Sequence, residues 1–205
     1  MFHLYSFSSA KRAIGRESAF IVQVAKKYSV PASWIRAILL KEMTELNPLD
    51  PIADAAVKLY YLQYRLTGRV PRSSLPFLGK KDSSTGWGQI FGFVAIDAIN
   101  RAADRKLTDY QELGLPVDHR LKKDSPDDLW LVWKQLNRDQ HFNIEVCALN
   151  LLSCAEEMNG RSDVLSFSPE EIKRTFTRYN ADVRSITQYG EKTFEYEREF
   201  QRQNV

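Results

Sequence analysis

One glutamate stands on the apolar face of a predicted helix. In the segment that begins near Pro31, the side chains at i, i+3, i+4 and i+7 are Ile35, Ile38, Leu39 and Glu42, and they share one face. Burial on the core side of a helix disfavours the charged carboxylate and raises its pKa. An acid that stays protonated near neutral pH can protonate a leaving oxygen. Glu42 is therefore the first candidate for a catalytic residue.

Two alternatives stay open on periodicity alone. Arg36 and Lys41 lie off the apolar face, which turns Glu42 toward the core, but a glutamate in the last turn of a helix can also be half exposed and purely structural. Glu45, one turn further on, shares the face and competes for the same role. The helix by itself does not decide between them.

The sequence lacks the residue patterns of metal sites, phosphate-binding loops and serine-type nucleophiles. His3, His119 and His141 have no zinc-ligand spacing with the two cysteines, and the sequence has neither a glycine-rich phosphate loop nor a nucleophile elbow. Cys147 and Cys154 are seven residues apart in one predicted helix. That spacing is about 10.5 Å along the axis, too far for a disulfide. We expect no metal and no organic cofactor.

The elements that position these residues are almost all helical. The chain has 205 residues, 43% hydrophobic and 27% charged, which suits one globular domain over residues 1–205. Helical periodicity dominates and strand alternation is nearly absent, so the expected fold class is all-α. We place a loop over residues 69–85. The predicted helices cover residues 18–28, 31–45, 54–67, 92–105, 126–138, 142–158, 168–180 and 182–201.

Charge and hydropathy limit the partners. A net charge of +3 favours anionic partners in general, such as cell-wall polymers, nucleic acids and lipid headgroups. The basic residues are interspersed with acids along the whole chain, so we expect no nucleic-acid partner. No apolar run approaches the ~20 residues that a membrane-spanning helix needs. We also expect no signal peptide, because the first residues lack an apolar block that ends in a small-residue cleavage site.

Five short segments follow one another in an order typical of one family. They are YSVPASWIRAILLKE (28–42), TGWGQI (85–90), FNIEVCALNLL (142–152), RYNADV (178–183) and YGEKTFEYEREF (189–200). The first resembles the helix that ends in the catalytic glutamate of lytic transglycosylases, which belong to the lysozyme-like superfamily. The others resemble that family's Gly-Leu-Met-Gln, Asn-Ile, Ala-Tyr-Asn-Ala-Gly and closing Tyr, Glu-Thr, Tyr motifs. The resemblance implies an all-α, lysozyme-like fold with a groove for the glycan strand of peptidoglycan.

The resemblance also implies roles for single residues. Glu42 would be the acid and then the base, and Tyr179 would reach it and help to set its protonation. Gln89 would hydrogen-bond the sugar chain, and Trp87 would stack on a sugar face. The implied substrate-binding residues are Gln89, Trp87, Gly88, Asn180 and Tyr196.

Structural alternatives stand beside these roles. Gln89 could be an ordinary loop amide, and Tyr179 and Tyr196 could be core aromatics. We expect Asn143 to bind backbone rather than sugar. Trp130 and Trp133, three residues apart in one predicted helix, are expected to be core residues.

Some positions depart from the family's pattern. Met43 replaces the serine that usually follows the glutamate, Gly88 stands where the family prefers Met, and Asp182 stands in place of Gly. The spacing between the motifs indicates two insertions, at about residues 53–80 and 105–140. These insertions could shape the groove, bind a partner or have no direct role.

The number of carboxylates distinguishes two reactions. Inverting hydrolysis needs a second carboxylate about 6.5–9.5 Å from the acid, and retention through an enzyme nucleophile needs one about 5 Å away. A lytic transglycosylase needs neither, because the substrate's own C6 hydroxyl attacks. Asp82, near the Gly86 motif, is the possible second carboxylate, and Asp50 and Asp54 are others; a solvated loop aspartate is the alternative. We favour transglycosylation.

The sequence thus predicts a peptidoglycan-cleaving enzyme that acts between N-acetylmuramic acid and N-acetylglucosamine. The alternatives are a hydrolytic muramidase, a catalytically silent lysozyme-like domain that binds glycan or protein, and a helical interaction module. We expect action at the bacterial cell wall, in the periplasm or outside the cell, after delivery by phage lysis or, as an antibacterial effector, by a secretion machine. Secretion machinery and an inhibitor protein are the expected protein partners.

Overall fold

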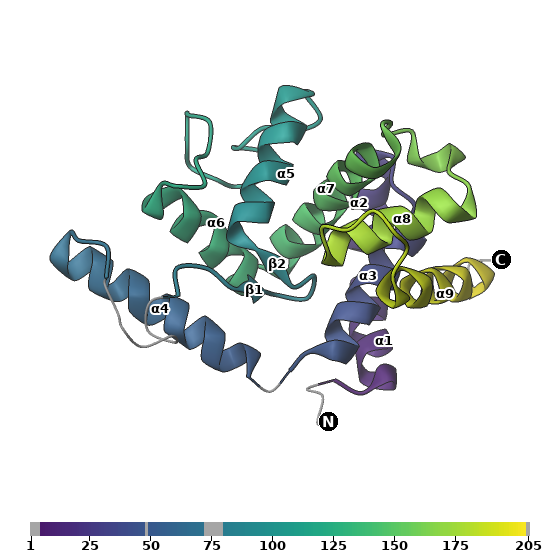
Figure 1. Cartoon of the computed structure of the whole chain (residues 1–205), viewed down its shortest axis with the longest axis horizontal. Coiled ribbons are helices and arrows are strands. Elements are labelled where there is room, and N and C mark those ends of the chain that lie inside the picture. The colour runs from purple at the N-terminus through teal and green to yellow at the C-terminus, as the bar shows by residue number, and fades with distance from the viewer. Residues whose placement is uncertain (1–4, 48, 72–79, 204–205) are drawn as a thin grey trace.

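The computed structural model describes residues 5–47, 49–71 and 80–203. Within these residues the fold is predominantly helical, as predicted (Figure 1). Part of the predicted loop and of the first predicted insertion, residues 72–79, lies outside the described residues, as does His3. The helices are α1 (Phe7–Arg16), α2 (Ser18–Tyr28), α3 (Ala32–Glu45), α4 (Asp50–Thr67), α5 (Gly92–Asp104), α6 (Pro126–Arg138), α7 (Gln140–Asn159), α8 (Pro169–Asn180) and α9 (Gln188–Gln203).

Three boundaries differ from the prediction. Helix α1 was not expected; the Ser6 hydroxyl caps it by accepting a hydrogen bond from the Ser9 amide. Helix α4 begins at Asp50 rather than at residue 54, because Pro51 occupies the first turn, where its missing N–H costs nothing. Helix α9 begins at Gln188 rather than at residue 182.

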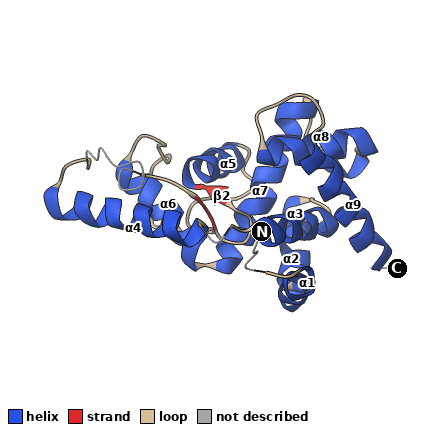
Figure 2. Cartoon of the chain, turned by 60° about the horizontal axis from the view of Figure 1, so that its bottom comes forward, coloured by secondary structure: helices blue, strands red, loops and turns tan. Residues whose placement is uncertain are grey.

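A short antiparallel hairpin interrupts the predicted loop. Strand β1 (Ser84–Thr85) pairs with β2 (Ile90–Phe91), and the TGWGQI segment forms the turn between them. Helix α5 follows β2 directly, so the hairpin lies at the beginning of that helix (Figure 2).

Helices α3 and α7 form the centre of the molecule. Ten residues of α3 are buried, including Arg36 and Lys41, which we expected to lie off the buried face. They are buried because α1, α2 and α9 all pack against α3 as well. Arg36 donates a hydrogen bond to the Ser18 hydroxyl, and Lys41 pairs with Glu45.

A second, smaller core holds α4 against α6. Val57, Tyr60 and Tyr61 of α4 pack on Trp133, whose side chain is fully buried. Trp130 stacks on the Trp133 ring, so both tryptophans are core residues, as predicted. The two segments that we interpreted as insertions, at about residues 53–80 and 105–140, therefore pack against each other through α4 and α6.

Helices α8 and α9 cross very closely at Gly190. A Cβ atom on this glycine would lie 2.2 Å from the Thr177 hydroxyl oxygen and 2.6 Å from the Lys173 carbonyl oxygen. No side chain fits there. Among the described residues, no helix is long and apolar enough to cross a bilayer.

Candidate active site

Glu42, in the last turn of α3, is the titratable group around which the site is arranged. Its carboxylate oxygen Oε1 accepts a short hydrogen bond from the Tyr189 hydroxyl. Burial raises the pKa of Glu42 from its ordinary 4.5 to about 7, and the charges of Glu45 and Asp50 raise it as well. The Tyr189 hydrogen bond and the charge of Lys41 act in the opposite direction, without cancelling the effect of burial. The acid is therefore about half protonated near neutral pH.

Glu42 lines a cavity of about 470 Å³ between the hairpin and α5 on one side and α7 and α8 on the other. In Figure 1 the hairpin and α5 lie to the left of α8, and the end of α3 runs downward toward α4. Of the residues singled out by the sequence, Gln89, Tyr179 and Asn180 line this cavity together with Glu42. Three separate motifs of the sequence thus meet at one site.

Asn143 fixes the turn of the hairpin against the rest of the protein. Its side-chain oxygen accepts a hydrogen bond from the Gly88 amide at 2.7 Å, and its amide nitrogen lies 3.2 Å from the Thr85 carbonyl and 3.3 Å from the Leu136 carbonyl. Asn143 binds backbone, as predicted. A Cβ on Gly88 would lie 3.0 Å from the Tyr179 hydroxyl, so the turn has little room for a larger residue at this position.

Gln89 lies in the cavity wall with an unusual backbone. Its φ is +46°, a left-handed conformation that costs a non-glycine residue roughly 1–3 kcal/mol. The side-chain amide donates to the Gly86 carbonyl at 2.8 Å and accepts from the Ser84 hydroxyl at 3.2 Å. An amide has two donor hydrogens and two acceptor lone pairs. Within the described part of the chain, one of each remains for a ligand in the cavity.

The tyrosine that reaches Glu42 is Tyr189, not Tyr179. The Tyr179 hydroxyl donates instead to the Gly88 carbonyl at 2.9 Å and lies 3.5 Å from the Cys147 sulfur. Burial raises the pKa of both tyrosines well above the ordinary value, so both stay protonated and can donate. Sequence reasoning missed Tyr189, although it is the first residue of the YGEKTFEYEREF segment.

Three predicted substrate contacts lie outside the cavity wall. Trp87 packs against the main core. Gly88 is buried, and its amide and carbonyl are taken by Asn143 and Tyr179. The Tyr196 ring lies 5.6 Å from the Phe7 ring and borders a different hollow.

Asp82, the expected second carboxylate, is a structural residue. Its two oxygens accept hydrogen bonds from the amides of Gly92 at 2.9 Å and Phe93 at 3.0 Å, where negative charge stabilises the start of α5. The carboxylate of Asp54 likewise accepts hydrogen bonds from within the protein, donated by the hydroxyls of Ser83 and Thr85. Neither aspartate lines the cavity.

The remaining acids of the cavity wall have cationic partners. Asp97 lies 2.8 Å from Lys123, and Glu157 lies 2.6 Å from Arg101 and 2.7 Å from Arg178. Asp182 lies 3.8 Å from Arg178. Glu42 differs because its hydrogen-bond partner is a neutral hydroxyl.

Helix α5 contributes residues that sequence reasoning did not assign to the site. Phe93, Asp97 and Arg101 follow one another at intervals of four and line the cavity together. This spacing places them on one helix face. This spacing was the only feature of the sequence that could have assigned these residues to the site, but residues on an ordinary solvated helix face have the same spacing.

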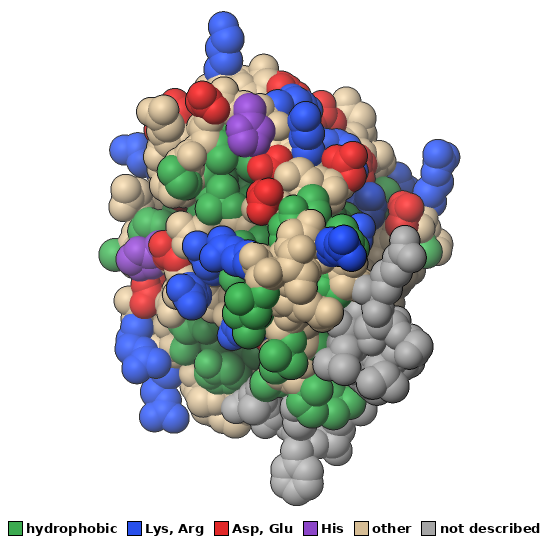
Figure 3. Space-filling model, turned by 90° about the vertical axis from the view of Figure 1, so that its left-hand side faces the viewer, with side chains coloured by type: hydrophobic (Ala, Val, Ile, Leu, Met, Phe, Trp, Pro, Cys, Tyr) green, Lys and Arg blue, Asp and Glu red, His purple; other side chains and the backbone are tan. Residues whose placement is uncertain are grey.

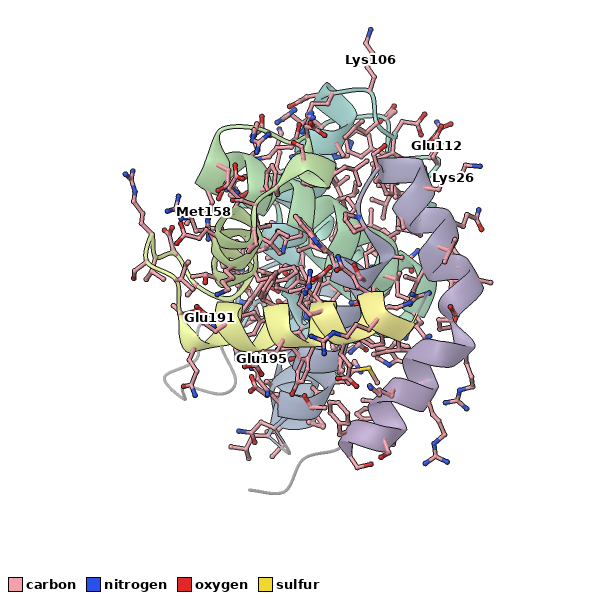
Figure 4. All side chains as sticks on the ribbon, turned by 90° about the vertical axis from the view of Figure 1, so that its right-hand side faces the viewer. Lys26, Lys106, Glu112, Met158, Glu191 and Glu195 are labelled. Carbon is pink, nitrogen blue, oxygen red and sulfur yellow. The ribbon has the colours of Figure 1, made fainter. Side chains whose placement is uncertain are left out.

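One further hollow adjoins the cavity, and a second adjoins that hollow. The first, of about 640 Å³, shares Asn180 with the cavity and is also lined by Tyr189; Figure 4 shows its acidic rim residues Glu191 and Glu195 on α9. The second, of about 450 Å³, shares Glu45 with the first and contains Tyr196. Shared residues therefore connect the three hollows in sequence.

The described residues contain no group of three or more His, Cys, Asp or Glu side chains arranged to hold a metal ion. Cys147 and Cys154 are both free and buried on α7, and burial raises the pKa of each thiol to about 12. Comparison of the chain with protein-family models, with curated proteins and with solved structures finds no match.

Proposed function

We propose that this protein is a lysozyme-like enzyme that cleaves the glycan strand of bacterial peptidoglycan between N-acetylmuramic acid and N-acetylglucosamine, by lytic transglycosylation. The observation that carries the proposal is Glu42: a carboxyl group with a pKa of about 7 in the wall of a cavity of about 470 Å³. A group with this pKa can both give and take a proton at neutral pH.

In the proposed reaction Glu42 acts twice. The protonated carboxyl first donates its proton to the glycosidic oxygen, and the bond from C1 of the muramic acid to this oxygen breaks. The C6 hydroxyl of the same sugar then attacks C1, and the Glu42 carboxylate accepts the hydroxyl proton. The product has a 1,6-anhydro ring, and Glu42 is protonated again. Tyr189 stabilises the carboxylate between the two steps by donating its hydrogen bond.

The other acids of the wall favour this route over hydrolysis. An inverting or retaining hydrolase requires a second carboxylate that acts as a base or nucleophile. Asp97 and Glu157 are held in ion pairs, and Asp82 caps α5. A reaction in which the substrate supplies the attacking hydroxyl needs none of them.

The wall also offers groups that suit a sugar chain. Gln89 has an unused donor and acceptor, and Asn150 and Ser153 of α7 bring further polar groups to the wall. Phe93 supplies an aromatic ring. The hollow lined by Tyr189, which shares Asn180 with the cavity, gives a polymer further room beyond the cavity. The net charge of +3 suits an anionic cell wall, where such an enzyme would act.

The test is to digest purified sacculi and weigh the released fragments. Transglycosylation gives products about 18 Da lighter than hydrolysed fragments, the mass of the one water that hydrolysis adds. Glu42→Gln should release nothing while still binding sacculi. The matched control is Glu170→Gln, an exposed glutamate of α8 that lines neither the cavity nor the adjoining hollow, which should retain activity.

The remaining outcomes are equally clear. Fragments with ordinary reducing ends would replace the proposal with a hydrolytic muramidase. No release by the wild-type protein, with binding retained, would leave a glycan-binding domain without activity. Neither release nor binding would overturn all three functions on peptidoglycan.

A further inference from the structure

Helix α4 has a second apolar face that the described residues leave exposed. Its inner face packs on Trp133, as described above. On the opposite face, Ile52, Leu59, Leu62 and Leu66 follow at intervals of seven, three and four residues, which aligns them along the helix. Each of these four side chains is at least 53% exposed. We call these four residues the outer stripe.

The charges beside the outer stripe have one sign. Lys58 and Arg65 are exposed, lie seven residues apart on one flank of the stripe, and have their cationic groups 5.9 Å from the rings of Trp133 and Trp130. Arg69, just beyond the helix, is also exposed. No Asp or Glu of α4 is exposed: both aspartates are half-buried, and Asp54 is hydrogen-bonded inward.

Figure 3 shows the side of the molecule on which α4 lies. Hydrophobic side chains gather on the lower half of this face, with Lys and Arg side chains above them. An apolar stripe with basic residues along it is the pattern of a helix that lies in the plane of a membrane surface.

We propose that the outer stripe of α4 binds the surface of a bilayer that contains anionic lipids. The aliphatic side chains would enter the boundary between headgroups and acyl chains, while Lys58, Arg65 and Arg69 remain among the headgroups. Each cation near an anionic leaflet strengthens binding by about fivefold at physiological salt. The inference does not depend on the proposed cleavage reaction, because α4 contributes no residue to the cavity wall.

A second copy of the chain is a poorer occupant. If two α4 helices pack antiparallel through their outer stripes, equivalent flanks face each other. Lys58 and Arg65 of one copy would then lie against the same residues of the other, with no exposed acid of α4 to neutralise them. An anionic lipid surface supplies the missing opposite charge.

The test is co-sedimentation of the full chain with two kinds of vesicle, one of phosphatidylcholine alone and one with a quarter of phosphatidylglycerol. We expect binding to the anionic vesicles that weakens as salt is raised. Leu66→Ser should lower the partition coefficient about tenfold, since it removes most of one leucine's buried apolar surface. Leu165→Ser is the matched control, because Leu165 is 69% exposed against 77% for Leu66 and belongs to another segment. This control variant should bind both kinds of vesicle as the wild type does.

The charges are tested in the same assay. Arg65→Gln should lower binding to anionic vesicles about fivefold. Lys26→Gln, on a face far from α4 (Figure 4), should have no effect. Failure of the wild-type chain to bind anionic vesicles, or equal binding by Leu66→Ser, would overturn the proposal. So would a lipid-free dimer, seen by light scattering, that Leu66→Ser dissociates, because the stripe would then be covered by a second copy.

Discussion

At the scale of single residues, the protonation of Glu42 results from two opposing contributions. Burial favours the neutral acid, and the hydroxyl of Tyr189 favours the carboxylate. Burial dominates, but the hydrogen bond keeps the pKa near 7 rather than higher. The tyrosine therefore determines the pH range in which the acid can also act as a base.

Replacing Tyr189 with phenylalanine should move this range. Without the donated hydrogen bond the carboxylate is less stable, so the pKa of Glu42 rises. The loss of activity on the alkaline side of the pH profile should then occur at higher pH. We also expect kcat to fall about tenfold, since the carboxylate formed during the reaction loses its donor. The measurement is the rate of sacculus solubilisation as a function of pH.

Tyr179→Phe is the control for this prediction. Its hydroxyl donates to the Gly88 carbonyl rather than to Glu42. This variant should lose about 1 kcal/mol of unfolding free energy and keep the alkaline limb where the wild type has it. A shift of the limb in Tyr179→Phe but not in Tyr189→Phe would contradict the assignment.

The pKa of Glu42 also makes stability depend on pH. In the folded protein the pKa is about 7, against an ordinary value of 4.5, so between these values the folded state holds more protons than the unfolded state. Stability from this group is complete below about pH 4.5 and decreases as pH rises through 7. Each pKa unit of difference corresponds to about 1.4 kcal/mol.

Glu42→Gln cannot titrate and should therefore gain stability relative to the wild type as pH rises. Urea unfolding of both proteins from pH 4.5 to 8 measures the difference. Parallel profiles for the two proteins would show that Glu42 has an ordinary pKa in the folded state.

At the scale of elements, the hairpin depends on one amide of α7. Asn143 connects the turn at Gly88 with the end of α6 through three hydrogen-bonding contacts. Its side chain is fully buried, so water cannot replace it. The position of Gln89 in the cavity therefore depends on a residue that does not itself line the cavity.

Asn143→Ala should cost about 3 kcal/mol of unfolding free energy, since it leaves buried backbone groups without partners. Activity should fall as well, because Gln89 loses its fixed position. Asn150→Ala is the matched control: it is a buried asparagine of the same helix, and among the described residues its side chain has one hydrogen-bonding contact, a weak one from Cys154 at 3.8 Å. Its cost should be below about 1.5 kcal/mol. Similar losses in unfolding free energy in both variants would contradict this account of the hairpin.

The sequence predicts most of these elements because helical periodicity is a local signal. The prediction failed where this periodicity was weak or interrupted. In α1, the buried residues Ala10, Ala13 and Ile14 have helical spacing, but polar residues surround them. At α4, the predicted start at residue 54 was late, because Pro51 lies in the first turn of the helix. The hairpin was missed because two-residue strands are too short to show alternation.

At the scale of the whole molecule, the hollow between α3 and α9 affects how a long strand would be cut under the proposed function. The cavity is lined by Glu42, this hollow is lined by Tyr189, and the two share Asn180, so the hollowed surface extends from the acid to its tyrosine. If the protein cleaves glycan strands as proposed, sugar units could lie in both. An enzyme that acts only at chain ends would instead have a groove that is closed at one end.

Early in a digestion we therefore expect glycan fragments of many lengths rather than single disaccharide units. Chromatography of the products after a few per cent of the bonds are cleaved measures the distribution. Early release of disaccharide units alone, with the long strands intact, would contradict the prediction.

The sequence could predict the position of site residues only where that position follows from their own helix or motif. Glu42 could be placed from the apolar residues beside it, whereas the contact with Tyr189 depends on how α9 packs along α3. Asp82 could not be recognised as a cap, because its partners are backbone amides ten residues or more further on. Such relations depend on the assembled fold, which single segments do not encode.

The close crossing at Gly190 affects how the chain can vary. Tyr189 immediately precedes Gly190. The contact between Gly190 and Thr177 therefore fixes the position of Tyr189 on α9, independently of the segment that leads into the helix. The exposed residues 183–185 can therefore change in composition, and even in length, without moving the tyrosine away from its acid. Substitutions of Gly190 itself are not tolerated in this way, because a side chain there would push the two helices apart.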